Sequence, residues 1–126
     1  MDYEKKKVLV IDDNPDIGDL VERALEGSEF EVLKASGGRE GIRMAQEQRP
    51  DLILLDIMMP DIDGFTVSNF LKKIPETENI PIIFLTARAT SSGRIIASKA
   101  GAVDYIMKPF SPKELLKRIK RIVNTM

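Results

Sequence analysis

Residues 51–60 read DLILLDIMMP, and this segment is the most informative one about the fold. An aliphatic run, 52–55, leads directly to Asp56, and a second apolar run follows as far as Pro60. A continuous apolar run of this length is typical of a central strand in a parallel sheet that is covered on both faces. Asp56 therefore stands where a buried strand opens into a loop, and a carboxylate is costly there unless a cation or water lies beside it.

Four further segments are predicted to be strands. VLVI and IIFL are as continuously apolar as LILL, and they lie in the predicted strands Lys7–Asp12 and Ile80–Thr86, which with Asp51–Asp56 should be central. Phe30–Ala35 mixes in charges and is expected at an edge of the sheet. Asp104–Met107 is the fifth strand.

Helical patterns alternate with these strands. The first helix is expected to start at Asn14-Pro15 and to stop at Gly27, and the second to follow Ser36. The third is predicted to begin after Asp63 and to end before Pro75, with an apolar face made by Val67, Phe70, Leu71 and Ile74. The segment that leads into the predicted fourth helix, 89–93, is rich in poor helix formers, so its first turn should be loosely held. The last helix should open with a capping box at Ser111–Glu114.

Strict alternation of strands and helices predicts a doubly wound α/β fold, with one domain over residues 1–126. Functional groups in such folds lie at the carboxyl ends of the strands. The N-terminus carries no signal-peptide pattern, and no apolar run approaches about 20 residues. We therefore expect a cytoplasmic protein without a membrane contact.

Composition excludes several kinds of chemistry. The chain has no cysteine and no histidine, so thiol nucleophiles, thiolate or imidazole metal sites and serine-histidine triads are ruled out. Any metal must be held by oxygen ligands, which suits Mg²⁺, Mn²⁺ or Ca²⁺. The 19 basic and 20 acidic residues nearly cancel, which argues against direct binding to nucleic acid.

Candidate site residues end four of the strands. Asp12 and Asp13 follow the first, Asp56 the third and Thr86 the fourth, while Lys108 follows the fifth. If the first and third strands are neighbours, three carboxylates converge and a divalent cation is needed to neutralise them, for which Mg²⁺ is the best fit. Such a site can transfer a phosphoryl group to Asp56 as nucleophile, with the metal and Lys108 stabilising the charge.

These motifs resemble the receiver domain of two-component response regulators. The resemblance rests on IDD at 11–13, LLDIMMPDIDG at 54–64, LTA at 85–87 and DYIMKPF at 104–110, in order along the chain. It implies a flavodoxin-like sheet of order 2-1-3-4-5 with five flanking helices. It also implies that a sensor histidine kinase or a histidine phosphotransfer protein donates the phosphoryl group to Asp56, in a domain that is not a multiple-turnover enzyme.

The resemblance further implies specific roles for site residues. Asp13, Asp56 and the backbone carbonyl of Met58 would bind Mg²⁺, or alternatively Mn²⁺, while Asp12 would hold metal-bound waters. Thr86 and Lys108 would contact the phosphoryl oxygens, next to a cis peptide bond at Lys108–Pro109.

The resemblance places the conformational switch at Thr86 and Tyr105. Helix four, strand five and helix five would form the surface that contacts an effector protein or an output domain, or that forms a phosphorylation-dependent dimer. The loop 88–93 lacks the acidic residues of many relatives. Met58 and Arg88 match positions that, by the same resemblance, modulate the lifetime of the phosphoryl group. We predict slow self-hydrolysis of the phosphorylated protein, because the apolar Met58 side chain cannot position an attacking water molecule.

Simpler interpretations remain for several residues. Asp61 and Asp63 are expected to be turn and cap residues, Asp104 to lie at the surface, and GGREG at 37–41 to start a helix. The basic residues of the last helix form either its solvated face or a docking surface: Lys113, Lys117, Arg118, Lys120 and Arg121. A small phosphohydrolase with an aspartyl-phosphate intermediate is the alternative function, but its usual second acid would stand at Met58. The chain could be a stand-alone regulator or a domain of a longer protein.

Overall fold

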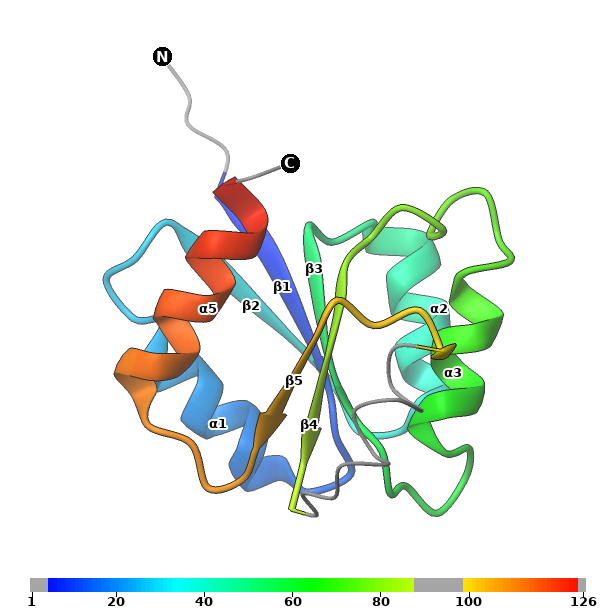
Figure 1. Ribbon diagram of the computed structural model, residues 1–126, viewed down its shortest axis with the longest axis horizontal. Helices are drawn as coiled ribbons and strands as arrows, with labels where there is room; N and C mark the ends of the chain where they lie inside the picture. The colour runs from blue at the N-terminus through cyan, green and yellow to red at the C-terminus, as the bar shows by residue number, and fades with distance from the viewer. Residues whose placement is uncertain (1–4, 88–98, 125–126) are drawn as a thin grey trace.

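Five parallel strands form one sheet at the centre of the protein (Figure 1). They are β1 (Lys6–Ile11), β2 (Phe30–Ala35), β3 (Leu52–Asp56), β4 (Ile82–Thr86) and β5 (Asp104–Met107). The computed structural model describes residues 5–87 and 99–124. The order is β2-β1-β3-β4-β5, and every neighbouring pair is parallel, which confirms the predicted topology.

Burial of the strands follows their sequence patterns. Every residue of β3 and β4 is buried, as are Val8–Ile11 of β1, whereas β2 exposes charged side chains at the edge of the sheet. The predicted central and edge positions are therefore confirmed. Three predicted strands differ from the observed ones by one or two residues at their ends.

Helices cover both faces of the sheet. Helices α1 (Pro15–Ala24) and α5 (Pro112–Asn124) lie on one face, and α2 (Gly38–Gln48) and α3 (Gly64–Leu71) lie on the other (Figure 1). These are the four helices of the described residues, and the predicted helix four, with its lead-in at 89–93, lies outside them. None of the helices described is long and apolar enough to span a membrane.

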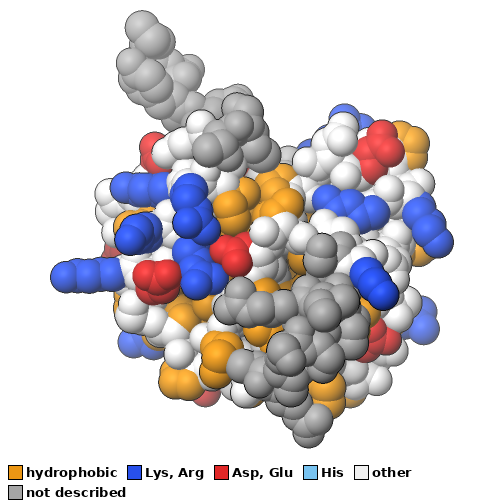
Figure 2. All heavy atoms as spheres, in the orientation of Figure 1, with side chains coloured by type: hydrophobic (Ala, Val, Ile, Leu, Met, Phe, Trp, Pro, Cys, Tyr) orange, Lys and Arg blue, Asp and Glu red, His pale blue; other side chains and the backbone are white. Residues whose placement is uncertain are grey.

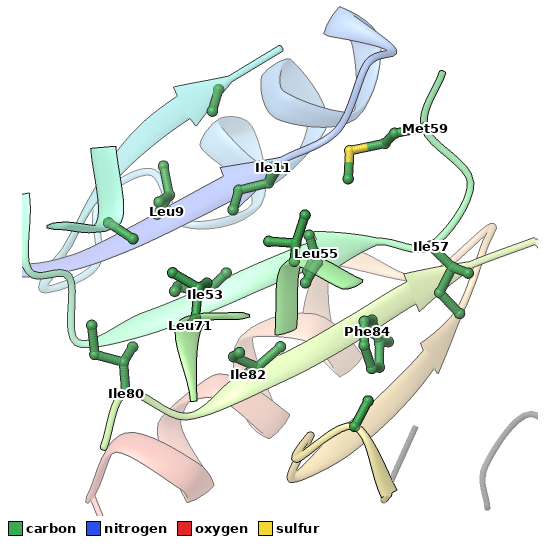
Figure 3. Packing of buried hydrophobic residues seen from close by; sticks show 14 of the residues in the cluster. Leu9, Ile11, Ile53, Leu55, Ile57, Met59, Leu71, Ile80, Ile82 and Phe84 are labelled. Carbon is green, nitrogen blue, oxygen red and sulfur yellow. The ribbon is translucent and has the colours of Figure 1, made fainter. Parts of the chain in front are cut away.

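Each face of the sheet has its own apolar core. The core under α1 and α5 joins Val10, Leu54 and Leu85 to Val21 and Leu115. The core under α2 and α3 is shown in Figure 3, where Leu71 of α3 packs with side chains of the sheet: Leu9 and Ile11 of β1, Ile53 and Leu55 of β3, and Ile82 and Phe84 of β4. Burial of these side chains is the main force that holds the helices onto the sheet.

Helix ends follow the predicted capping chemistry. The Asn14 side chain accepts a hydrogen bond from the Asp16 N–H at 3.0 Å, and Gly27 adopts a positive φ of 77° in the loop after α1. Ser111 Oγ accepts the Glu114 N–H at 3.0 Å, but the Glu114 carboxylate bonds to Arg118 rather than closing the predicted capping box.

The glycines of α2 have a packing role that the sequence did not indicate. A Cβ atom on Gly41 would lie 2.5 Å from Cδ1 of Ile11, inside van der Waals contact. Glycine lowers helix propensity at this position, but it lets α2 approach β1 closely. The weak pattern of this helix therefore reflects close helix-sheet packing.

The prediction for α3 was wrong in part. Phe70 is 50% exposed, and the helix ends at Leu71, so Ile74 lies beyond it. Gly64, Val67, Ser68 and Leu71 face the sheet instead, which turns Phe70 toward solvent. The Thr77 hydroxyl donates to the Leu71 carbonyl at 2.6 Å, and this bond satisfies a backbone acceptor at the end of the helix.

Candidate functional site

Three carboxylates meet at the carboxyl edge of the sheet. Asp56 is the last residue of β3, and Asp12 and Asp13 follow β1, its neighbour. Their ligand oxygens all lie within 4.8 Å of one another. Asp12 and Asp56 are only 5% and 7% exposed, whereas Asp13 is exposed to solvent. The convergence expected from the sequence is therefore present.

Lys108 reaches into this cluster from the end of β5. Its Nζ lies 2.7 Å from Asp12 Oδ2 and 3.4 Å from Asp56 Oδ1, and its side chain is 18% exposed. The Lys108 N–H donates to the Thr86 carbonyl at 2.7 Å, and the Lys108–Pro109 peptide bond is cis, as the resemblance implied. The ammonium group partly balances the charge of two buried carboxylates.

The environment raises the pKa of Asp56 to about 6. Burial is the main cause because it disfavours the charged carboxylate, and the nearby Asp12 carboxylate adds repulsion. The Lys108 ammonium and the Met58 backbone N–H act in the opposite direction. Asp56 is therefore a carboxylate that a further cation would stabilise strongly.

The Asp12 carboxylate is also held in place by the loop that follows β1. Asp12 Oδ1 accepts a hydrogen bond from the Asn14 N–H at 2.9 Å, while the Asn14 side chain caps α1. One short loop thus orients the carboxylate and starts the helix. The sequence identified Asn14 as a cap, but not as a donor to Asp12.

Gly64 packs directly against the strand end that carries Asp56. Its N–H donates to the Ile57 carbonyl at 2.7 Å, and a Cβ atom at this position would overlap the Asp56 carbonyl oxygen. Only glycine fits this approach without a shift of the backbone. This packing role of Gly64 was not predicted from the sequence, although the position of Gly64 in PDIDG is a signal for it.

Asp61 and Asp63 are cap residues, as predicted. Asp63 Oδ1 accepts the Thr66 N–H at 3.0 Å and caps α3. Asp61 accepts the Arg39 and Gly38 N–H groups at 3.0 Å each, so it caps α2 from a different loop. These backbone hydrogen bonds lower the pKa of Asp61 to about 2.

The remaining predicted residues lie around the cluster. Thr86 ends β4 beside β3 and is 3% exposed, and Tyr105 of β5 is 4% exposed, in register with Phe84. The Met58 side chain, on the loop after Asp56, is 64% exposed. Arg88 and the loop 88–93 lie outside the described residues.

A pocket of about 400 Å³ adjoins the carboxylates. It lies between the ends of β1 and β2 and the start of α1, and Asp12 and Asp13 form part of its wall. Asp12 and Asp13 are thus reachable from solvent through this pocket. The all-oxygen donor set of the three carboxylates fits a hard divalent cation, and the Lys108 ammonium group beside Asp56 can pair with an anion.

Curated relatives share this sequence along most of its length. A probable transcriptional regulator, ycf27, from Cyanophora paradoxa is 42% identical over 98% of this chain and 50% of its own length. The DNA-binding dual master transcriptional regulator RpaA from a Synechocystis strain is 40% identical over 93% of this chain and 48% of its own length. The chain therefore spans about half the length of these relatives.

Solved structures share the fold. A putative response regulator from Chloroflexus aurantiacus is 35% identical, with a TM-score of 0.88 over 94% of this chain and 98% of its own. The receiver domain of sensor histidine kinase PA1611 from Pseudomonas aeruginosa, whose structure has a magnesium ion in the active site cleft, is 31% identical, with a TM-score of 0.86 over 94% of this chain and 98% of its own. The family model of the response regulator receiver domain matches residues 8–120. The chain belongs to the response regulator receiver domain family.

Proposed function

We propose that this receiver domain accepts a phosphoryl group on Asp56 from the phosphohistidine of a sensor kinase or a histidine phosphotransfer protein. The observation that carries the proposal is the placement of Asp56 at a buried strand end, within 4.8 Å of the other two carboxylates and 3.4 Å from Lys108. The absence of histidine from the chain agrees with a donor on another protein.

Mg²⁺ is the proposed cofactor, with Mn²⁺ as a substitute. Asp13, Asp56 and the Met58 backbone carbonyl would bind it, and Asp12 would hold its waters. The donor set is all oxygen, and a bound cation would offset the burial and the repulsion from Asp12 that raise the pKa of Asp56. When bound, the ion supplies positive charge next to the phosphoryl oxygens. The magnesium in the PA1611 receiver supports this assignment.

In the transfer step, an Asp56 carboxylate oxygen attacks phosphorus. The new O–P bond forms as the P–N bond to the donor imidazole breaks, and the imidazole nitrogen keeps the electron pair. Lys108 is already beside Asp56 and would neutralise charge on the phosphoryl oxygens, while the Thr86 hydroxyl would donate to one of them. The product is an acyl phosphate, whose hydrolysis resets the signal.

The output is proposed to be conformational rather than enzymatic. Thr86 and Tyr105 would respond to the phosphoryl group, and the surface of helix four, β5 and α5 would then bind an effector protein, an output domain or a second receiver. The names of ycf27 and RpaA support a role in transcription, with DNA contacts made by a domain other than this one. We expect the domain to meet its kinase in the cytoplasm.

The test is phosphorylation by acetyl phosphate, followed by intact mass with and without Mg²⁺. We expect the gain of one phosphoryl group, dependent on Mg²⁺ and lost in Asp56→Asn. Asp61→Asn is a matched control, because it removes a carboxylate from the same loop without touching the cluster, and it should be phosphorylated normally. Phosphorylation of Asp56→Asn to the same extent, or continuous release of phosphate over many turnovers, would overturn the proposal.

Met58 is proposed to set the lifetime of the phosphoryl group. Its side chain is apolar and offers no group to orient an attacking water molecule. Met58→Ala should shorten the lifetime by admitting water, measured as loss of the phosphorylated mass with time. An unchanged or longer lifetime in Met58→Ala would show that Met58 does not shield the site.

A further inference from the structure

The guanidinium group of Arg118 is bound to the backbone of Tyr105. Arg118 Nη1 donates to the Tyr105 carbonyl at 3.1 Å and to the Asp104 carboxylate at 3.3 and 3.4 Å, and its Nε donates to Glu114 at 2.9 Å. Asp104 Oδ1 in turn accepts the Tyr105 N–H at 2.8 Å. The Asp104–Arg118 ion pair therefore contacts both backbone polar groups of Tyr105.

This ion pair is more enclosed than an ordinary surface pair. The side chains of Arg118 and Asp104 are 27% and 16% exposed, whereas both partners in each pair made by Lys34 and Arg43 are at least 40% exposed. Partial burial strengthens charge-assisted hydrogen bonds relative to exposed ones. The expectations of a surface Asp104 and a solvated Arg118 were therefore wrong.

Other basic residues of α5 do point outward. Lys113, Lys117, Lys120 and Arg121 are exposed, and Figure 2 shows blue side chains gathered over the region of this helix. Arg121 Nη2 lies 3.8 Å from Asp104, and its side chain is 68% exposed. Arg118 thus differs from its neighbours on the same helix in depth and in the number of its hydrogen bonds.

The sheet separates the Tyr105 ring from α5. Tyr105 packs in the core under α2 and α3, with Phe84, whereas Ile106 packs on the opposite face with Leu115 and Ile119 of α5. The Tyr105 ring therefore lies on the face of the sheet opposite α5, so a movement of the ring cannot reach α5 by direct contact. The backbone of β5 is common to both faces, and Arg118 binds it at Tyr105.

We propose that Arg118 is a positioning residue that ties α5 to the switch at Tyr105, so that α5 follows a displacement of β5 on phosphorylation. The apolar contacts of Ile106 hold α5 against the sheet but do not fix its direction of movement, because dispersion contacts are non-directional. Hydrogen bonds from one guanidinium to a carbonyl and a carboxylate are directional and supply that constraint. The inference rests on the proposed function of Asp56 and Tyr105.

Arg118→Met tests the link because methionine retains an apolar stem and removes every donor. Lys120→Met, at an exposed position of the same helix, is the matched control. Amide spectra of ¹⁵N-labelled protein would be recorded before and after addition of Mg²⁺ and beryllium fluoride, which occupies a carboxylate as a phosphoryl group does. In the wild type and in Lys120→Met, we expect shifts at Tyr105 and in α5. In Arg118→Met, the shift at Tyr105 should remain, while the shifts of residues 115–123 should be lost.

Undiminished α5 shifts in Arg118→Met would overturn the proposal. If that variant does not fold, Arg118→Lys serves instead: it keeps the charge but lacks the planar fork, so α5 shifts smaller than in the wild type are expected and equal shifts overturn the proposal. Intact mass after acetyl phosphate treatment separates the two hypotheses. A wild-type protein that takes no phosphoryl group contradicts the proposed function, whereas a phosphorylated Arg118→Met with a fully responding α5 contradicts only the link.

Discussion

The Lys108 ammonium group lies 2.7 Å from Asp12, closer than its 3.4 Å separation from Asp56. At rest, the lysine is therefore chiefly the partner of the carboxylate that is not expected to be the nucleophile. Its proximity to Asp56 nevertheless lowers the pKa of that group against the effect of burial. Lys108 is thus placed to balance the carboxylates before phosphorylation and the phosphoryl group afterwards.

Replacement of Lys108 by methionine should destabilise the metal-free protein at pH 8 by about 3 kcal/mol, because it leaves buried carboxylates without their cation. Mg²⁺ should recover much of this loss. Urea unfolding with and without Mg²⁺ measures both effects. A loss of stability that Mg²⁺ does not reduce would indicate that packing, and not charge, is the role of Lys108.

The pKa of about 6 for Asp56 predicts a pH dependence for metal binding. One pH unit below this value, roughly a tenth of the groups are ionised, so Mg²⁺ affinity at pH 5 should be roughly tenfold weaker than at pH 8. Calorimetric titration at the two pH values checks this. Equal affinities would mean that Asp56 is ionised at pH 5.

The raised pKa of Asp56 also makes the stability of the metal-free protein depend on pH. The folded, metal-free protein binds the Asp56 proton more tightly than the unfolded chain, whose pKa is near 3.8. The stabilising contribution of this protonation is complete below 3.8 and is lost as the pH rises through about 6. Asp56→Asn should abolish it, so the variant should be more stable than the wild type at pH 8 without Mg²⁺, and the difference should shrink at pH 4.

Asp61 should show the opposite pH dependence. Its pKa is lowered to about 2, so its contribution to the free energy of unfolding is present above 3.8 and lost as the pH falls through about 2. Asp61→Ala should cost about 1 kcal/mol at pH 7, as for other helix caps. Chemical unfolding at pH 7 and at pH 2 measures the change, with Glu76→Ala, an exposed loop substitution, as control. A cost that is the same at both pH values would argue against a charged cap.

Gly64→Ala should destabilise the fold and disturb the acidic cluster. The new methyl group would meet backbone atoms of Asp56 and Ile57 that cannot rotate away, and overpacking of this kind costs roughly 1 to 3 kcal/mol or more. Gly18→Ala is the contrasting control, since its Cβ would meet only the flexible Lys34 side chain in a helix that favours alanine. Thermal unfolding compares the two, and equal effects would contradict the assigned role of Gly64.

The strand-helix alternation, the central position of β1, β3 and β4, and the set of residues at the strand ends could all be predicted from the sequence. These features depend on local patterns: continuous apolar runs, caps and an aspartate where burial makes charge costly. The motif order around Asp56 was also sufficient to indicate the family. Phe70 was misplaced because a short helix offers few turns over which a pattern can be tested.

The contacts among these groups could not be predicted from local patterns. The preference of Lys108 for Asp12, the contact of Gly64 with the Asp56 backbone and the bond from Arg118 to Tyr105 each join segments that the sequence keeps apart. Such contacts depend on how closely helices approach the sheet and on which atoms become buried together, quantities that are set by packing of the whole domain. Local patterns therefore identified the residues at the site, while packing fixed their distances and charges.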